Sequence, residues 1–236
     1  KPSKFSLQYS FSPIISYRKL EGSNDAKLIS TINTIPNALN IQGEVENLVS
    51  HLPAPGIELG TSLLYHVRPR LALKTGLQFN YSRYEINAFK SPGEIATISL
   101  NGGSNNRAIY NYSQHRNFGG TLPEVLQNSY FQLSIPVGVE WTAIGNDKVQ
   151  FGIAGSLQPT YLLNKDSYLI STDYKNYTQQ PNSNAELFVS FQTPTVRWQV
   201  GPQFRYQVLS GFRKEYPIKQ NLMEYGLKIG VSRPVK

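Results

Sequence analysis

The chain has 236 residues, of which 16% are charged and 12% aromatic, with a formal net charge of +8 and a mean hydropathy of −0.35. No apolar run approaches the roughly 18 residues that a membrane-spanning helix requires, which excludes a helical membrane protein. The chain contains no cysteine and therefore no disulfide framework. Its positive charge is not gathered into a basic block, so we expect no nucleic acid partner.

The dominant pattern is a strict alternation of apolar and polar residues in eight segments. In the first segment, apolar side chains between Phe5 and Tyr17 alternate with Gln8 and several serines. A period of two places one set on each face of a β-strand. The other segments span residues 57–67, 71–81, 131–141, 149–161, 186–192, 196–208 and 223–232. The pattern predicts a single all-β domain over residues 1–236, an eight-stranded antiparallel up-and-down transmembrane β-barrel with long extracellular loops.

The connections between these segments alternate between short and long. The short ones lie near residues 68–70, 144–148 and 193–195. The long ones span about residues 19–56, 86–127, 165–183 and 210–221. Tight periplasmic turns and long outer loops are typical of outer-membrane barrels. We therefore expect a bacterial outer-membrane location with both termini in the periplasm.

Aromatic residues gather toward the two ends of the segments. Those expected at the periplasmic rim are Phe5, Tyr65, Trp141, Phe151, Phe191 and Trp198. Those expected at the outer rim are Tyr17, Phe79, Tyr81, Phe131, Tyr161, Phe204 and Tyr206. Amphipathic rings concentrate at the level of the lipid headgroups, so the pattern predicts two aromatic girdles.

The polar faces of the segments would line the lumen, and they carry several charges. These residues are Glu58, Lys74, Glu140, Glu186, Arg197, Arg205, Glu224 and Lys228, with His66 at the periplasmic end. Eight strands leave an interior just wide enough for side chains to fill, and buried charges must pair. We expect an ion-pair network that plugs the lumen, with a narrow conduction path or a small-ligand pocket as the alternative.

Three features interrupt the simple pattern. Prolines at positions 13, 136, 159 and 202 fall inside strands, where we expect bulges or kinks. The β-like pieces 95–100 and 108–112 are too short to cross a bilayer, which favours a hairpin outside the membrane over a ten-stranded barrel. In the first long loop, Val45, Leu48, Val49 and Leu52 have helical spacing, so we expect a short amphipathic helix that ends at Pro53.

Catalytic chemistry has little support in the sequence. The histidines are His51, His66 and His115, and we place them apart, with the first and last in separate outer loops. No nucleophile motif or cluster of metal ligands accompanies them, so we expect no enzyme activity, cofactor or metal. Cations expected at the outer rim are Arg18, Lys19, Arg83, Lys165, Arg213 and Lys214. They would extend to the interface or contact phosphates of lipopolysaccharide.

Three stretches carry a resemblance to a known family. The run from Tyr130 to Val137 has Ile-Pro after an aromatic start, and the strands Phe5–Tyr17 and Tyr225–Val231 open and close the pattern. Together they resemble the outer-membrane β-barrel domain family of Bacteroidota, the PorT-like small barrels. The resemblance covers nearly the whole chain and implies the fold and the location, but members differ in role. Unlike many barrels, this chain ends in Lys236 rather than in an aromatic residue.

The functional hypotheses therefore concern the role of a barrel. The first is a structural or interaction module, meaning a membrane anchor or an accessory subunit in envelope assembly, secretion or signalling. Its partners would be outer-membrane lipid, lipopolysaccharide, and proteins bound through loops or termini. The alternative is a small pore or carrier for small solutes. Because some related barrels are joined to an inner-membrane anti-sigma module, the barrel of such a membrane-spanning protein is a further alternative, as is a soluble lipocalin-like carrier.

Overall fold

The computed structural model describes residues 4–22, 50–100, 107–116, 121–164, 180–212 and 218–235. The strands of this part of the chain are β1 (Phe5–Gly22), β2 (His51–Arg68), β3 (Leu71–Leu100), β4 (Arg107–Arg116), β5 (Leu122–Ser134), β6 (Val137–Gly145), β7 (Val149–Leu162), β8 (Gln180–Gln192), β9 (Arg197–Gln207) and β10 (Ile218–Pro234). Among these residues there is no helix with the length and apolar character needed to cross a membrane.

The sheet closes into an eight-stranded antiparallel ring. The order around the ring is β1, β2, β3, β5 with β6, β7, β8, β9 and β10, and β10 pairs again with β1. The fourth predicted strand is divided at Ile135 and Pro136 into β5 and β6, and both halves pair with β3 and β7. The predicted fold class, an eight-stranded barrel, is confirmed.

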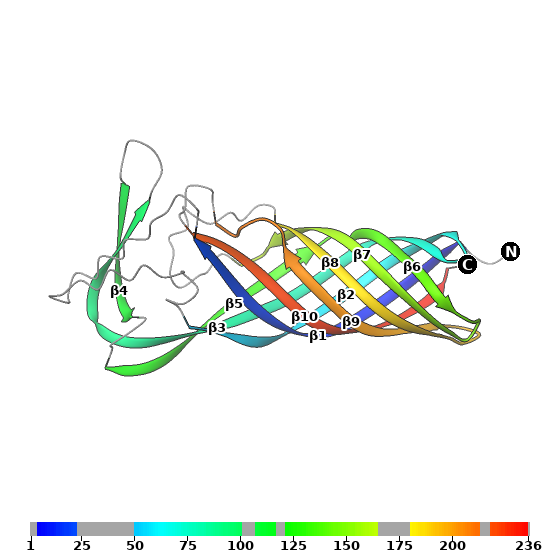
Figure 1. Cartoon of the computed structure of the whole chain (residues 1–236), viewed down its shortest axis with the longest axis horizontal. Helices are drawn as coiled ribbons and strands as arrows, with labels where there is room; N and C mark the ends of the chain where they lie inside the picture. The colour runs from blue at the N-terminus through cyan, green and yellow to red at the C-terminus, as the bar shows by residue number, and fades with distance from the viewer. Residues whose placement is uncertain are drawn as a thin grey trace.

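The two ends of the barrel differ. The short turns, the start of β1 and the end of β10 share one end, where Val235 N–H donates to the carbonyl of Phe5 at 2.9 Å. We call this the short-turn end and the opposite one the long-loop end (Figure 1).

At the long-loop end, β3 leaves the ring after Lys90, and its distal part pairs with β4 as far as Leu100 and Arg107. The predicted hairpin is confirmed. The ten-stranded alternative is wrong, because β4 pairs only with β3 among the described strands.

Two local expectations differ from the structure. No bulge occurs at Pro13, Pro159 or Pro202, where strand pairing continues without a register shift because ladder bonds on both sides of each proline hold the register. At Pro136 the expected irregularity is present, since the strand is interrupted between β5 and β6. The chain is extended at Leu52 and Pro53, which belong to β2 and pair with β3, so no helix ends there. The rest of that predicted helix lies outside the described residues.

The barrel reverses the usual distribution of polarity. Tyr9 and Phe11 face outward and are 59% and 44% exposed, whereas the neighbouring Gln8 and Ser12 face the lumen and are 1% and 0% exposed. The same alternation runs along the other ring strands, with apolar side chains outside and polar ones inside. An apolar exterior is stable in hydrocarbon and costly in water. The surface is that of a membrane barrel.

This reversed pattern ends within the strands. On β3, the outward side chains are apolar up to Tyr81, apart from Thr75, and then become Arg83 and Glu85. The inward side chains become Ile86 and Ala88, both buried. Beyond Tyr81 the barrel therefore has the polarity of a water-soluble protein. The strands extend past the apolar band, which is why β1 reaches Gly22 and β2 begins at His51, inside the predicted first loop.

Close packing of neighbouring strands yields a stability prediction. A Cβ atom added at Gly201 would lie 1.8 Å from the carbonyl oxygen of Leu187. We expect Gly201→Val to lower the free energy of unfolding by about 1–3 kcal/mol, because backbone must move. At Gly155 the nearest atom would be 4.0 Å away, so Gly155→Ala is the tolerated control. Urea unfolding in detergent, followed by tryptophan fluorescence, measures both. Equal losses of unfolding free energy for the two substitutions would contradict the close packing at Gly201.

Candidate functional site

The candidate functional site is the lumen, because it concentrates the polar and charged side chains of the barrel. Its charge network contains four carboxylates and four cations, and seven of these eight residues are buried, with Arg197 half-buried. The carboxylates are Glu58, Glu140, Glu186 and Glu224, and the cations are Lys74, Arg197, Arg205 and Lys228. The network therefore balances its own charge, as burial away from water requires.

The centre of the network is organised around Glu186 on β8. This carboxylate accepts from Lys228 on β10 and lies 3.5 Å from Lys74 Nζ, which reaches across the lumen from β3. Asn184 Nδ2 also donates to Glu186, at 3.0 Å. One carboxylate thus holds two ammonium groups from strands that are not neighbours in the ring.

A second charge cluster surrounds Arg205 on β9. Its Nη1 lies 3.8 Å from Glu58 and 3.6 Å from Glu224, and its Nη2 donates to Gln132 Oε1 at 3.0 Å. Asn80 Nδ2 donates to both oxygens of Glu224 at 2.9 Å. The guanidinium group can serve several acceptors at once because its five donors form a fixed fork.

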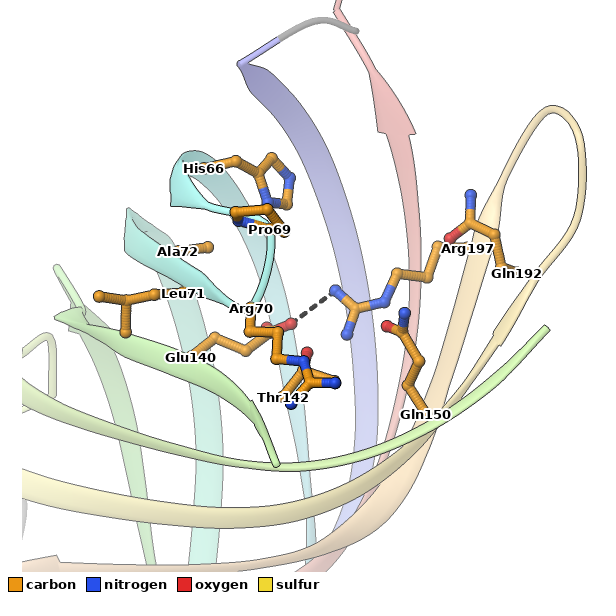
Figure 2. A pocket seen from close by; sticks show the side chains of 10 residues that line it. All are labelled: His66, Pro69, Arg70, Leu71, Ala72, Glu140, Thr142, Gln150, Gln192 and Arg197. Carbon is orange, nitrogen blue, oxygen red and sulfur yellow. Dashed lines mark hydrogen bonds and ion pairs between the residues drawn. The ribbon is translucent and has the colours of Figure 1, made fainter. Parts of the chain in front are cut away.

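At the short-turn end the lumen opens into a cavity of about 170 Å³. An ion pair of 2.6 Å between Arg197 Nη1 and Glu140 Oε1 spans it from β9 to β6 (Figure 2). The guanidinium group also lies over the ring of Phe188, 5.5 Å from its centroid. Arg70 and His66 line the same cavity, and His66 Nε2 lies 3.1 Å from Ser6 Oγ. Sequence reasoning placed His66 correctly at this end of the lumen but missed Arg70, which lies in a turn.

Toward the long-loop end, a tyrosine cluster replaces the ion pairs. Tyr84 Oη accepts from Arg18 at 3.1 Å and from Asn128 at 2.6 Å, and it lies 3.3 Å from Tyr130 Oη. Gln220 Nε2 on β10 donates to Tyr130 Oη at 3.1 Å. The predicted position of Arg18 at the outer rim is wrong. Its side chain is 6% exposed and points into the lumen, in phase with the inward serines of β1.

An apolar layer lies next to the tyrosines. Ile86, Leu126, Leu162 and Leu222 are buried in one cluster with Tyr84 and Tyr130, although they come from four different strands. The lumen therefore changes from charged at its centre to apolar at the long-loop end. No sequence signal marked these residues, because their strands there lack the apolar-outside pattern.

The histidines are separate from one another. His66 lies near the end of a strand, β2, as predicted, whereas His51 and His115, predicted in outer loops, lie on β2 and β4. His51 on β2 lies edge-on to Tyr84 beyond the apolar band, and burial together with the nearby Arg18 charge lowers the pKa of its imidazole to about 4. His115 on β4 pairs with Glu124 at 3.0 Å.

No group of three or more metal-ligating side chains occurs within the described ranges. Of the predicted rim cations, Lys165, Arg213 and Lys214 lie outside those ranges.

The aromatic residues lie on the outward faces of the strands. Near the short turns, Phe5 pairs with Tyr65 at a ring distance of 5.0 Å, and Trp198 is the strand partner of Phe191. At the other edge of the apolar band, Tyr81 and Phe131 are 4.9 Å apart. The other rings predicted for the two girdles also face outward, namely Tyr17, Phe79, Trp141, Phe151, Tyr161, Phe204 and Tyr206.

Comparison with known proteins supports the fold. No protein-family model matches the chain, and no curated protein does. The outer membrane protein OprG of Pseudomonas aeruginosa is similar in structure, with a TM-score of 0.52 and 9% identity over 100% of this chain and 98% of OprG. Neisserial surface protein A is also similar, with a TM-score of 0.46 and 14% identity over 100% and 99% of the two chains. The likeness to OprG shows the fold alone, and the resemblance to PorT-like barrels stays a prediction.

The Glu186 cluster yields a second stability prediction. Glu186→Gln leaves two buried lysines without their carboxylate, so we expect a loss of about 3–5 kcal/mol in the free energy of unfolding. Lys74→Met, the matched variant, preserves the pair between Lys228 and Glu186 and should cost less. Urea unfolding in detergent at neutral pH measures both. A larger loss for Lys74→Met than for Glu186→Gln would contradict the central role of this carboxylate.

Proposed function

We propose that the chain is an integral outer-membrane β-barrel that acts as a structural or interaction module, with a lumen plugged by its own side chains. The observation that carries this proposal is that side chains from opposite strands meet across the lumen at successive levels. Such a barrel anchors a surface in the membrane and does not transport solutes. The role is that of a membrane anchor or an accessory subunit.

The contacts across the lumen run from one end of the barrel to the other. From the short-turn end, they join β9 to β6, β3 to β8, β3 to β10 and β10 to β5. The pairs concerned are Arg197–Glu140, Lys74–Glu186, Asn80–Glu224 and Gln220–Tyr130. A solute could pass only by separating these groups and the apolar layer beyond them. These contacts therefore disfavour the alternative of a small pore or carrier.

The exterior supports the outer-membrane location and the orientation. The apolar band with aromatic rings at both edges matches the surface that lipid requires. Outer-membrane barrels have short turns on the periplasmic side. By this rule we propose that the termini of this chain lie in the periplasm and the β3–β4 hairpin lies outside the cell. In such a chain the surface available to external partners is the long-loop end.

The base of the hairpin is attached to the barrel. Glu124 on β5 lies 3.0 Å from His115 Nε2 on β4 and 3.6 Å from Lys90 Nζ on β3. Thr121 N–H donates to the Lys90 carbonyl at 2.8 Å. These contacts join β3, β4 and β5 where the hairpin leaves the ring. A surface held in this way is suited to contact a protein partner, since less order must be gained on binding.

Conductance measurements test the plugged lumen. We expect the purified barrel, reconstituted into planar bilayers, to give no reproducible single-channel steps, because hydrogen bonds and ion pairs close the lumen. A large porin inserted in the same way is the positive control for insertion and recording. Reproducible steps of uniform size from this chain would instead establish the pore hypothesis.

Labelling of single cysteines tests the orientation. The chain has no cysteine of its own, so each introduced thiol is the only one. Gln114 on β4 and Asp147 in the β6–β7 turn are both accessible positions outside the apolar band. On intact cells, a membrane-impermeant maleimide should label Gln114→Cys and leave Asp147→Cys unlabelled until the outer membrane is permeabilised. The opposite labelling pattern would invert the proposed orientation.

A further inference from the structure

The cavity at the short-turn end has the features of a ligand site that the anchoring role does not require. We propose that it binds a small oxyanion, namely a phosphate or carboxylate group, between the guanidinium groups of Arg197 and Arg70. Its volume of about 170 Å³ leaves room for several water molecules or one such anion. The proposal concerns this cavity alone and does not depend on whether the barrel anchors a partner.

The first argument is that two buried donors of Arg197 have no partner. Its ion pair with Glu140 uses only Nη1, while Nε and Nη2 are buried and have no hydrogen-bond partner among the described side chains. A guanidinium group can donate two parallel hydrogen bonds from neighbouring nitrogens to two oxygens of a carboxylate or phosphate. The unused donors therefore match an oxyanion in number and in kind.

Arg197 is also held in place before any ligand arrives. Glu140 fixes one side of the guanidinium group at 2.6 Å, and the ring of Phe188 covers its face. Glu140 itself is 3% exposed, so its side chain has little freedom to move away. A donor group whose position is already set loses less entropy when it binds a ligand.

The second argument is a surplus of positive charge. Each cation of the lumen network lies beside a carboxylate, whereas Arg70, an exposed residue that lines the cavity, makes no ion pair with any described residue. It lies in the turn between β2 and β3, where its carbonyl accepts from Thr142 N–H at 2.9 Å. Figure 2 shows the Arg70 side chain reaching into the cavity beside Glu140 and Arg197. Two guanidinium groups against one carboxylate give the cavity a net positive charge.

The remaining wall of the cavity is polar and uncharged. Gln150 on β7 and Gln192 at the end of β8 present amide groups, and Thr142 on β6 presents a hydroxyl group (Figure 2). These side chains can donate further hydrogen bonds to the oxygens of an anion. A cavity with a surplus positive charge and neutral donors favours a monovalent anion over an apolar or cationic ligand.

Phosphate titration tests the site. The barrel is purified in a maltoside detergent, which contains no phosphate, and titrated with sodium phosphate or sodium acetate at low ionic strength by isothermal calorimetry. We expect saturable binding with one site per chain. Arg70→Gln should weaken phosphate binding by about tenfold. Arg70→Lys should retain part of the affinity, because lysine keeps the positive charge but lacks the paired donors of the guanidinium group.

The matched control is Arg68→Gln, which removes the same charge from an equally exposed arginine two positions away that does not line the cavity. Equal weakening of binding by Arg68→Gln and Arg70→Gln, or a heat signal that does not saturate, would overturn the proposed site and indicate general charge attraction.

A soluble short-chain phosphatidylglycerol identifies the source of the ligand. Binding of that lipid in place of inorganic phosphate assigns the site to a lipid headgroup, and binding of phosphate alone assigns it to a free oxyanion.

Discussion

The structure depends on one constraint. In a hydrocarbon layer, every backbone N–H and C=O group needs a hydrogen-bond partner within the protein. A sheet satisfies that need only when it has no open edge in the lipid. Here the pairing of β1 with β10, from Ser6 and Pro234 to Gly22 and Ile218, removes the last edge. Once the ring closes, one face of each strand must meet lipid and the other must meet the lumen, so the period-two alternation and the reversed polarity follow from the closure.

Closure with eight strands then dictates the character of the lumen. A ring of this size encloses side chains and little else, so polar groups that point inward must satisfy one another. Glu186 and Arg205 each bond to residues of several strands, which makes the network a set of ties across the ring. Under the proposed function, the same ties that neutralise buried charge also close the lumen to solutes. Stability and a closed lumen would then have a common origin in this barrel.

The sequence predicted the structure well where lipid imposes the alternation and poorly where it does not. Within the apolar band each strand and short turn was predicted, because an apolar side chain at every second position indicates a strand with one face in lipid. Beyond Tyr81 the outward residues become polar and the strands looked like loop, although pairing continues to Lys90 with β5. Arg18 was misplaced for a related reason. Its position near the end of the apolar band suggested contact with lipid headgroups. Only its even spacing from Ser12 and Ser16 along β1 indicated that it faces the lumen.

The two ends of the lumen consequently differ in what they can do. At the long-loop end, Tyr84 and Tyr130 bond across the ring under a layer of aliphatic side chains, and Arg18 already donates to Tyr84. At the short-turn end, Arg197 has two donors to spare and Arg70 has no counter-charge among the described side chains. An anion that entered there would meet Glu140 and, beyond it, the balanced charges of the network. The asymmetry favours binding at one face of the barrel and argues against movement through it.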